Sequence, residues 1–132
     1  MDTDISAVRK SILLEGELTE KILGAAIKLH NALGCGFLER VYENALAAEM
    51  KKSGVSVEQQ KSFPVWYDGV VVGDYVADLV VAGRAVVECK AVQNLEPVHE
   101  AQLLNYLKAS GLRVGLLLNF ARPKLQYRRM VL

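Results

Sequence analysis

Apolar positions recur at helical spacing through the first third of the chain. From Thr19 to Gly34, and again from about Leu38 to Ser53, apolar residues lie three or four positions apart. This spacing is typical of an amphipathic helix that buries one face. Gly34 and Gly54 follow the last periodic positions, where glycine commonly ends a helix. We therefore predict two consecutive helices in this part of the chain.

Short runs rich in β-branched residues, separated by turn signals, fill the middle of the chain. They predict a meander of strands over residues 55–67, 70–72, 75–82 and 85–90. Asp68-Gly69 and Gly83-Arg84 stand where tight hairpin turns would go. Pro64 cannot donate a backbone hydrogen bond, so we place the first strand at an edge or a bulge of the sheet.

A third helix and two more strands are predicted after the meander. Pro97 is suited to the first turn of a helix, which runs through Lys108, and strands follow over 114–119 and 125–131. Two helices, a meander, a helix and further strands indicate a mixed α/β sandwich with a central mixed sheet flanked by helices. The 132 residues suit one domain, which we place at 18–132 after a polar N-terminal arm, 1–17.

Three charged residues interrupt the apolar sequence of the last two meander strands. Asp78 lies in one run, and Glu88 and Lys90 end the next. Side chains alternate along a strand, so Glu88 and Lys90 share one face while Cys89 points the other way, and the turn brings Asp78 toward them. Charged groups in such positions are costly unless they are paired or bind a metal.

Two interpretations of this cluster follow from the residues alone. One is a structural ion pair between Glu88 and Lys90, or a sheet face that is exposed to solvent. The other is a divalent-metal site in which Asp78 and Glu88 supply the hard oxygen ligands that Mg²⁺ prefers. Lys90 would then orient or deprotonate a water, or stabilise charge on a phosphate.

Two helix faces could complete such a site. Glu39, Tyr42 and Glu43 lie on one face of the second helix, although a carboxylate in a first turn also complements the helix dipole. Gln102 and Tyr106 share a face of the third helix, which on its own is typical of a solvated stripe. His30, at the end of the first helix, is a further candidate, but such a histidine is more often a helix cap or a satisfied core residue.

Composition describes an ordinary globular protein, with 52% hydrophobic and 23% charged residues. The apolar runs are too short for a membrane span, and no secretory leader is evident, so we expect no membrane partner. Cys35 and Cys89 have no metal-binding spacing, and we expect reduced thiols in a cytoplasmic protein.

Charge is distributed unevenly although the net charge is only +1. All 15 acidic residues lie at or before Glu100, and six bases with no acid follow: Lys108, Arg113, Arg122, Lys124, Arg128 and Arg129. This segment could contact nucleic-acid phosphates, or it could be a solvated face balanced by acids elsewhere in the fold. With so little net charge, a homodimer would help to gather enough phosphate contacts.

Together, these segments resemble a known family. Gly36-Phe-Leu-Glu39-Arg-Val-Tyr42 is a Gly-x-x-Glu-x-x-Tyr signature, and the chain also carries Pro97-Val-His-Glu-Ala-Gln-Leu-Leu-Asn-Tyr106 and Gly111-Leu-Arg-Val-Gly-Leu-Leu-Leu-Asn-Phe120. Over roughly residues 18–131 the sequence is similar to the GxxExxY protein family, which is grouped with the PD-(D/E)xK nuclease-like superfamily.

The resemblance implies a restriction-endonuclease-like core and a site on the meander. Asp78 and Glu88 would be metal ligands together with the Cys89 backbone carbonyl, and Lys90 would be the catalytic lysine. Glu39 would be the carboxylate from the preceding helix, and Gln102, with Tyr106 one turn later, would match the helical glutamine of some branches. Ala77 stands where the superfamily motif has proline.

The leading hypothesis from the sequence is a Mg²⁺- or Mn²⁺-dependent nuclease that hydrolyses DNA or RNA. Two alternatives stay open. One is a nuclease-like domain without turnover that binds nucleic acid or a protein partner. The other is a structural subunit in which residues 78, 88 and 90 form an ion-pair network.

Overall fold

The structure is a computed structural model, and its description covers residues 13–132. Three helices and five strands occur within this range. In chain order they are α2 (Gly16–Leu33), α3 (Glu39–Lys52), β1 (Val57–Tyr67), β2 (Val70–Val81), β3 (Ala85–Lys90), α4 (Pro97–Ser110), β4 (Val114–Asn119) and β5 (Gln126–Val131). Residues 1–12, which make up most of the predicted N-terminal segment 1–17, lie outside the described residues.

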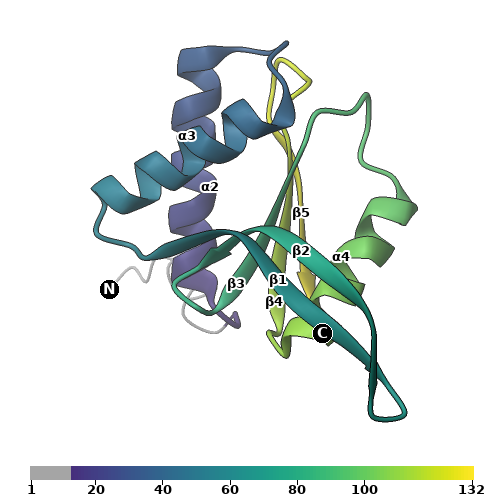
Figure 1. Ribbon diagram of the computed structural model, residues 1–132. Helices are drawn as coiled ribbons and strands as arrows, with labels where there is room; N and C mark the ends of the chain where they lie inside the picture. The colour runs from purple at the N-terminus through teal and green to yellow at the C-terminus, as the bar shows by residue number, and fades with distance from the viewer. Residues whose placement is uncertain (1–12) are drawn as a thin grey trace, which may run out of the picture.

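The five strands form one sheet in the order β1-β2-β3-β4-β5. Neighbouring strands are antiparallel except for β3 and β4, which are parallel and are joined through α4. Helices α2 and α3 lie against one face and α4 against the other (Figure 1). The predicted mixed α/β architecture, with a restriction-endonuclease-like core, is confirmed.

Each face of the sheet has its own apolar core. Under α2 and α3 the core includes Ile22, Leu46 and Leu116, none of which is exposed to solvent. Under α4 it includes Leu103 and Leu107, also fully buried, packed against alternate positions of the same strands. β3 and β4 are buried on both faces, which explains their largely apolar sequences.

Two predicted elements differ from the structure by more than two residues at a boundary. α2 begins at Gly16 because Thr19 is not its cap: the Thr19 hydroxyl donates to the Gly16 carbonyl oxygen at 3.1 Å from within the first turn. The runs predicted separately at 70–72 and 75–82 form the single strand β2. β1 pairs with β2 on both sides of Gly73, so the glycine does not interrupt the strand.

The turns set the register of the meander. Asp68 and Gly69 both have positive φ, 48° and 75°, as a two-residue hairpin turn requires, which confirms that prediction. The second turn was predicted one residue too short. It spans residues 82–84, so Val81 pairs with Ala85. This register places Asp78 directly opposite Glu88 along the two strands.

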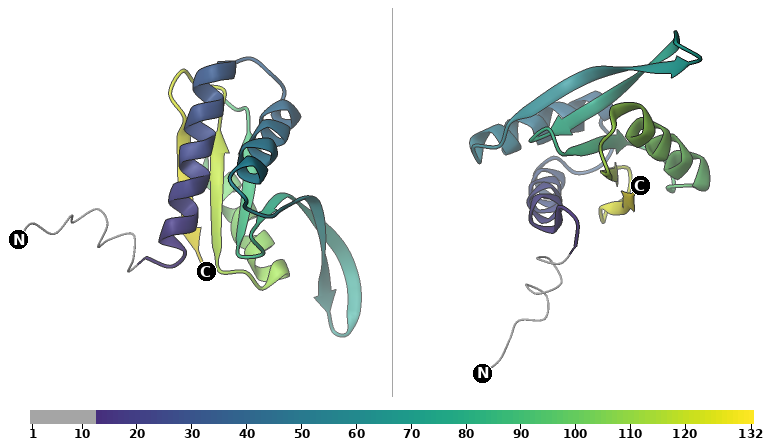
Figure 2. Two further views of the ribbon diagram at one scale, coloured as in Figure 1. Left: turned by 90° about the vertical axis from the view of Figure 1, so that its left-hand side faces the viewer. Right: turned by 90° about the horizontal axis from the view of Figure 1, so that it is seen from below.

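The first hairpin extends beyond the rest of the domain. β1 is the outermost strand, and its pairing shifts between Val65 and Trp66, directly after Pro64, as the proline predicted. Figure 2 shows the far half of the β1–β2 hairpin projecting as a two-stranded ribbon past the end of α4.

Two features bear on the expectations for thiols and membranes. Cys35 is an exposed free thiol and Cys89 a buried one. Within residues 13–132, no helix has the length and apolar character needed to cross a membrane.

Gly115 is predicted to be essential for packing between β4 and α4. A Cβ atom at this position would lie 2.7 Å from Cδ1 of Leu103, whose side chain is fully buried. We expect Gly115→Val to lower the free energy of unfolding by about 2 kcal/mol or more. Urea denaturation measures this change. Gly73→Val is the matched control, because a Cβ at that strand glycine meets no atom within 4 Å. Equal stability of the two variants would contradict the prediction.

Candidate active site

The candidate site forms where the ladder between β2 and β3 ends. The last paired residues on this side are Leu79 and Val87. Beyond them, side chains replace backbone pairing. The Asp78 N–H donates to Oε1 of Glu88 at 3.2 Å, and the Cys89 N–H donates to Oδ2 of Asp78 at 2.9 Å. This reciprocal exchange holds the two carboxylates beside each other, as the sequence predicted.

Glu88 is unusual because it is a carboxyl group only 4% exposed. Burial, and next the negative charge of Asp78, raise the pKa of Glu88 to about 9. Lys90 acts in the opposite direction, but its effect on this pKa is smaller. In the absence of a bound cation, Glu88 therefore holds a proton at neutral pH.

The alternation predicted for the end of β3 is present. Cys89 is fully buried in the core beneath α2 and α3, and burial raises the pKa of its thiol well above the usual value. Glu88 points away from that core, and Lys90 is half-buried. Cys89 can therefore offer the site only its backbone.

Gln60 is a central residue of the site that sequence analysis missed. Its Nε2 donates to Oδ1 of Asp78 at 3.3 Å and to Oε1 of Glu43 at 2.8 Å. Gln60 has a φ of 51° in the interior of β1, between the pairs Gln59–Leu79 and Lys61–Ala77. A left-handed backbone at a non-glycine residue is costly and is common at functional sites. Two adjacent glutamines within a predicted strand were the only signal in the sequence.

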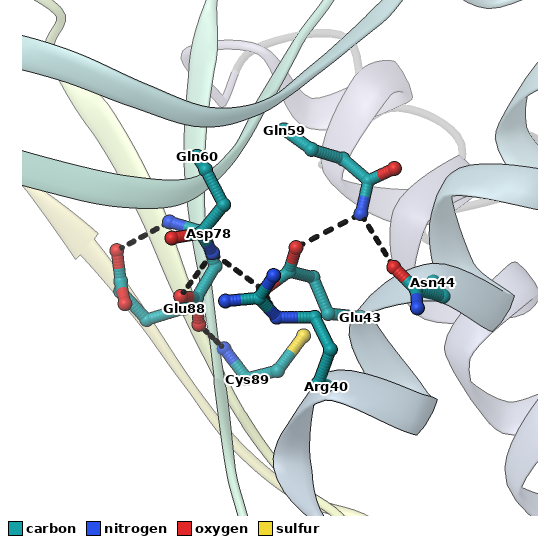
Figure 3. A network of polar contacts seen from close by, with 8 residues as sticks. All are labelled: Arg40, Glu43, Asn44, Gln59, Gln60, Asp78, Glu88 and Cys89. Atoms are coloured by element: carbon teal, nitrogen blue, oxygen red, sulfur yellow. Dashed lines mark hydrogen bonds and ion pairs between the residues drawn. The ribbon is translucent and has the colours of Figure 1, made fainter.

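Glu43 connects α3 to this network. Only 2% of it is exposed, and its carboxylate accepts hydrogen bonds from Gln60 and from Nε2 of Gln59, the latter at 2.8 Å. Nε of Arg40 lies 3.5 Å from Oε1 of Glu43. The chain of contacts from Glu43 through Gln60 to Asp78 ties the helix to β2 (Figure 3).

The Gly-x-x-Glu-x-x-Tyr segment places Glu39 beside the end of β3. The Tyr42 hydroxyl donates to the Gly34 carbonyl oxygen at 2.6 Å and accepts the Phe37 N–H at 3.2 Å, which fixes the loop before α3. The Tyr42 ring stacks on Phe120, with centroids 4.6 Å apart. Oε1 of Glu39 then accepts the N–H of Ala91, the residue after Lys90, at 3.2 Å. Tyr42 therefore supports the site from the core without facing it.

On the opposite side, α4 brings Tyr106 toward the carboxylates. Burial, and then the charges of Glu88 and Asp78, raise the pKa of Tyr106 to about 12, so its phenol remains a hydrogen-bond donor. Its ring lies 4.9 Å from that of Tyr75. Gln102, one turn earlier on α4, is exposed, and its side chain forms no hydrogen bond with another described residue.

His30 is a buried structural residue in this arrangement. Nε2 of its ring lies 3.1 Å from the carbonyl oxygen of Phe120, and the two rings meet edge to face. The contact joins the end of α2 to the end of β4, and it involves neither Asp78 nor Glu88.

The six bases after Glu100 do not form one face. Arg113 precedes β4 and Arg122 follows it, so they lie at opposite ends of the strand. Arg128 lies 3.5 Å from Glu100, which balances its charge. Nη1 of Arg122 donates to Oδ1 of Asn94 at 2.6 Å, in the loop that follows Lys90. Of these three arginines, only Arg122 contacts the loop at the end of the site.

The donor set at this point suits a hard divalent cation. Asp78 and Glu88 present adjacent carboxyl groups, and a bound cation would offset the burial and the charge of Asp78 that otherwise keep Glu88 protonated. Within residues 13–132, no group of three or more histidine, cysteine or acidic side chains has metal-binding geometry. Mg²⁺ is commonly held by one or two carboxylates, with waters and phosphate oxygens completing its shell. The residues present therefore fit Mg²⁺ or Mn²⁺ rather than a metal held by protein ligands alone.

Comparison with known families agrees with this geometry. The family model of the PD-(D/E)XK nuclease superfamily matches residues 16–130, and the chain belongs to that superfamily. No curated protein and no solved structure matched the chain.

The Glu88 carboxyl predicts how the stability of the metal-free protein depends on pH. Its pKa rises from 4.5 in the unfolded chain to about 9 in the folded one. This group therefore stabilises the fold fully below pH 4.5, and its contribution is lost as the pH approaches 9. In the presence of chelator, at a pH of about 8, we expect the free energy of unfolding of Glu88→Gln to be at least about 1.4 kcal/mol higher than that of the parent. This difference is the equivalent of one pKa unit.

Urea denaturation across this pH range measures the effect. Glu58→Gln, at an exposed position of β1, is the control and should keep the pH dependence of the parent. A Glu88→Gln variant whose stability falls with pH as steeply as that of the parent would show that Glu88 is already ionised.

Proposed function

We propose that this member of the PD-(D/E)XK nuclease superfamily is a metal-dependent phosphodiesterase that cleaves DNA or RNA. The observation that supports this most strongly is the pair of carboxylates, Asp78 and Glu88, held side by side with Lys90 following on the same strand. A structural ion pair would not need a second carboxylate beside Glu88, because the charge of Asp78 raises the pKa of Glu88.

In this proposal, Asp78, Glu88 and the carbonyl of Cys89 would hold Mg²⁺ or Mn²⁺. When bound, such an ion would polarise a phosphoryl oxygen and lower the pKa of a water. Metal binding would replace the proton on Glu88, so affinity should rise with pH.

Lys90 is the proposed catalytic lysine. Its ammonium group would orient the attacking water or offset the charge that builds on the phosphate in the transition state. Glu39 bonds the backbone directly after Lys90, which supports a role in positioning this residue or in holding a second ion. Gln102 and Tyr106 would contact the substrate from α4, with the Tyr106 phenol as a donor.

Contacts with the nucleic-acid backbone would come from the same end of the sheet. Arg122 and Lys124 lie in the loop between β4 and β5, and Arg122 contacts the loop after β3. Both side chains are exposed. Cations beside the carboxylates would bring a phosphate to the metal, and they favour nucleic acid as the substrate class.

Within the superfamily, we place the chain in the GxxExxY branch. The support is that Tyr42 fixes the loop that contains Gly36, and that Glu39 reaches the end of β3.

Lys90 gives the decisive test of catalysis. We expect Lys90→Ala to lower Mn²⁺-dependent cleavage at least about 100-fold while leaving Mn²⁺ affinity and stability close to those of the parent. Single- and double-stranded DNA and RNA would be tested as substrates, with Mn²⁺ binding followed by calorimetry. Lys61→Ala, which removes a lysine paired with Glu58 on β1, is the control.

The outcomes separate the rival functions. Equal cleavage by Lys90→Ala and the parent would exclude this mechanism. Saturable Mn²⁺ binding by the parent without cleavage of any of these nucleic acids would favour a nuclease-like domain that only binds nucleic acid or a protein partner. Absence of saturable Mn²⁺ binding would favour the structural ion-pair network.

Gln60 is predicted to position Asp78 for the metal. We expect Gln60→Ala to weaken Mn²⁺ binding about 10- to 100-fold, because residues that orient a ligand commonly contribute this much. Gln59→Ala is a close control: Gln59 bonds the same Glu43 carboxylate but does not contact Asp78. Calorimetric titration of both variants with Mn²⁺ measures the difference, and equal affinities would remove Gln60 from the site.

A further inference from the structure

The far end of the β1–β2 hairpin is apolar and uncovered. We define the arm as residues 64–74, all of which are exposed except Val65, which is half-buried. Trp66 is 63% exposed and Tyr67 73%. The next strand adds three exposed valines, Val70, Val71 and Val72. Figure 2 shows this ribbon standing clear of both helical layers.

Apolar side chains occupy both faces of the arm. Trp66 pairs with Val71 and Tyr67 with Val70, and neighbouring pairs point to opposite faces of a two-stranded ribbon. A hairpin of two strands is marginally stable in water without a surface to pack against. Contiguous exposed apolar surface of this kind usually marks an interaction site. The arm therefore requires a partner surface.

A groove suited to such a ribbon lies beside the base of the arm. It has a volume of about 470 Å³ and runs between the hairpin and the outer face of α4. The hairpin side is formed by Pro64, Val65, Trp66 and Tyr75, and the helix side by Asn105, Lys108 and Ala109. The groove is thus mainly apolar, with one cation on its rim.

Charge indicates what the arm binds. The arm carries two acids, Asp68 and Asp74, and neither lysine nor arginine. Among the described residues, neither acid forms a salt bridge, and neither does Lys108 in the groove. A nucleic-acid backbone would be repelled by the arm, and an anionic membrane would find no base on it. The groove of another copy offers both the apolar lining and the missing cation.

We propose that the arm joins two copies of this chain in a twofold dimer. Each arm packs into the groove of the other copy, with its acidic turn toward the partner's Lys108. Such an exchange is self-complementary, so it closes at two copies and uses each surface twice. The proposal does not rest on nuclease activity.

Sedimentation velocity over about a hundredfold range of protein concentration tests the proposal. The parent is expected to be a dimer that dissociates on dilution. Trp66→Glu places a charge in the centre of the interface and should raise the dissociation constant at least about 30-fold. Val98→Glu is the matched control, because Val98 is 54% exposed on the first turn of α4, away from the groove.

A charge-reversal pair identifies the contact itself. Asp68→Lys and Lys108→Asp should each weaken the dimer, and the double variant should recover most of the lost affinity. A monomeric parent would overturn the proposal. So would a parent dimer that Trp66→Glu and Val98→Glu affect equally, or one in which the two charge reversals are merely additive. Mn²⁺ titration of the same samples reports separately on the proposed metal site.

Discussion

The repulsion between two carboxylates at the end of a buried ladder is the constraint around which this domain is organised. Asp78 and Glu88 each accept a backbone N–H from the opposite strand, so the groups that repel each other also hold the strands in register. Burial makes a full negative charge on both carboxyls unfavourable, and Glu88 keeps its proton. A divalent cation would offset the negative charge and so remove this conflict. An apolar side chain in place of either carboxyl could not respond to a cation in this way.

The surrounding residues hold these two carboxyl groups in place. Tyr42 fixes the loop that precedes α3. From α3, Glu39 then reaches the end of β3, and Glu43 reaches Gln60 on β1. Gln60 adopts a left-handed backbone so that one amide reaches both Glu43 and Asp78. The strain at Gln60 is tolerated because both of its bonds are to carboxylates, which are stronger acceptors than neutral groups.

The sequence predicts most of what depends on local periodicity. Asp68-Gly69 identified its turn because left-handed residues close such hairpins, and alternation placed Glu88 and Cys89 on opposite faces. Gln60 could not be recognised, because its role follows from a break in strand pairing, which depends on the partner strand. The scattering of Arg113 and Arg122 to opposite ends of β4 is likewise a matter of topology. A count of bases along the chain does not contain that information.

The β1–β2 hairpin contributes Gln60 and Asp78 to the carboxylate site and also forms the arm, and two irregularities in its pairing separate these two parts. The left-handed residue Gln60 lies where β2 leaves β3, and the second irregularity, at Val65 and Trp66, lies where the ribbon leaves α4. Irregular pairing increases local twist. The hairpin is therefore divided into an inner half that builds the carboxylate site and an outer half that faces away from it. A partner could thus bind the arm without entering the site, and α4, which lines the groove and carries Tyr106, is the element the two share.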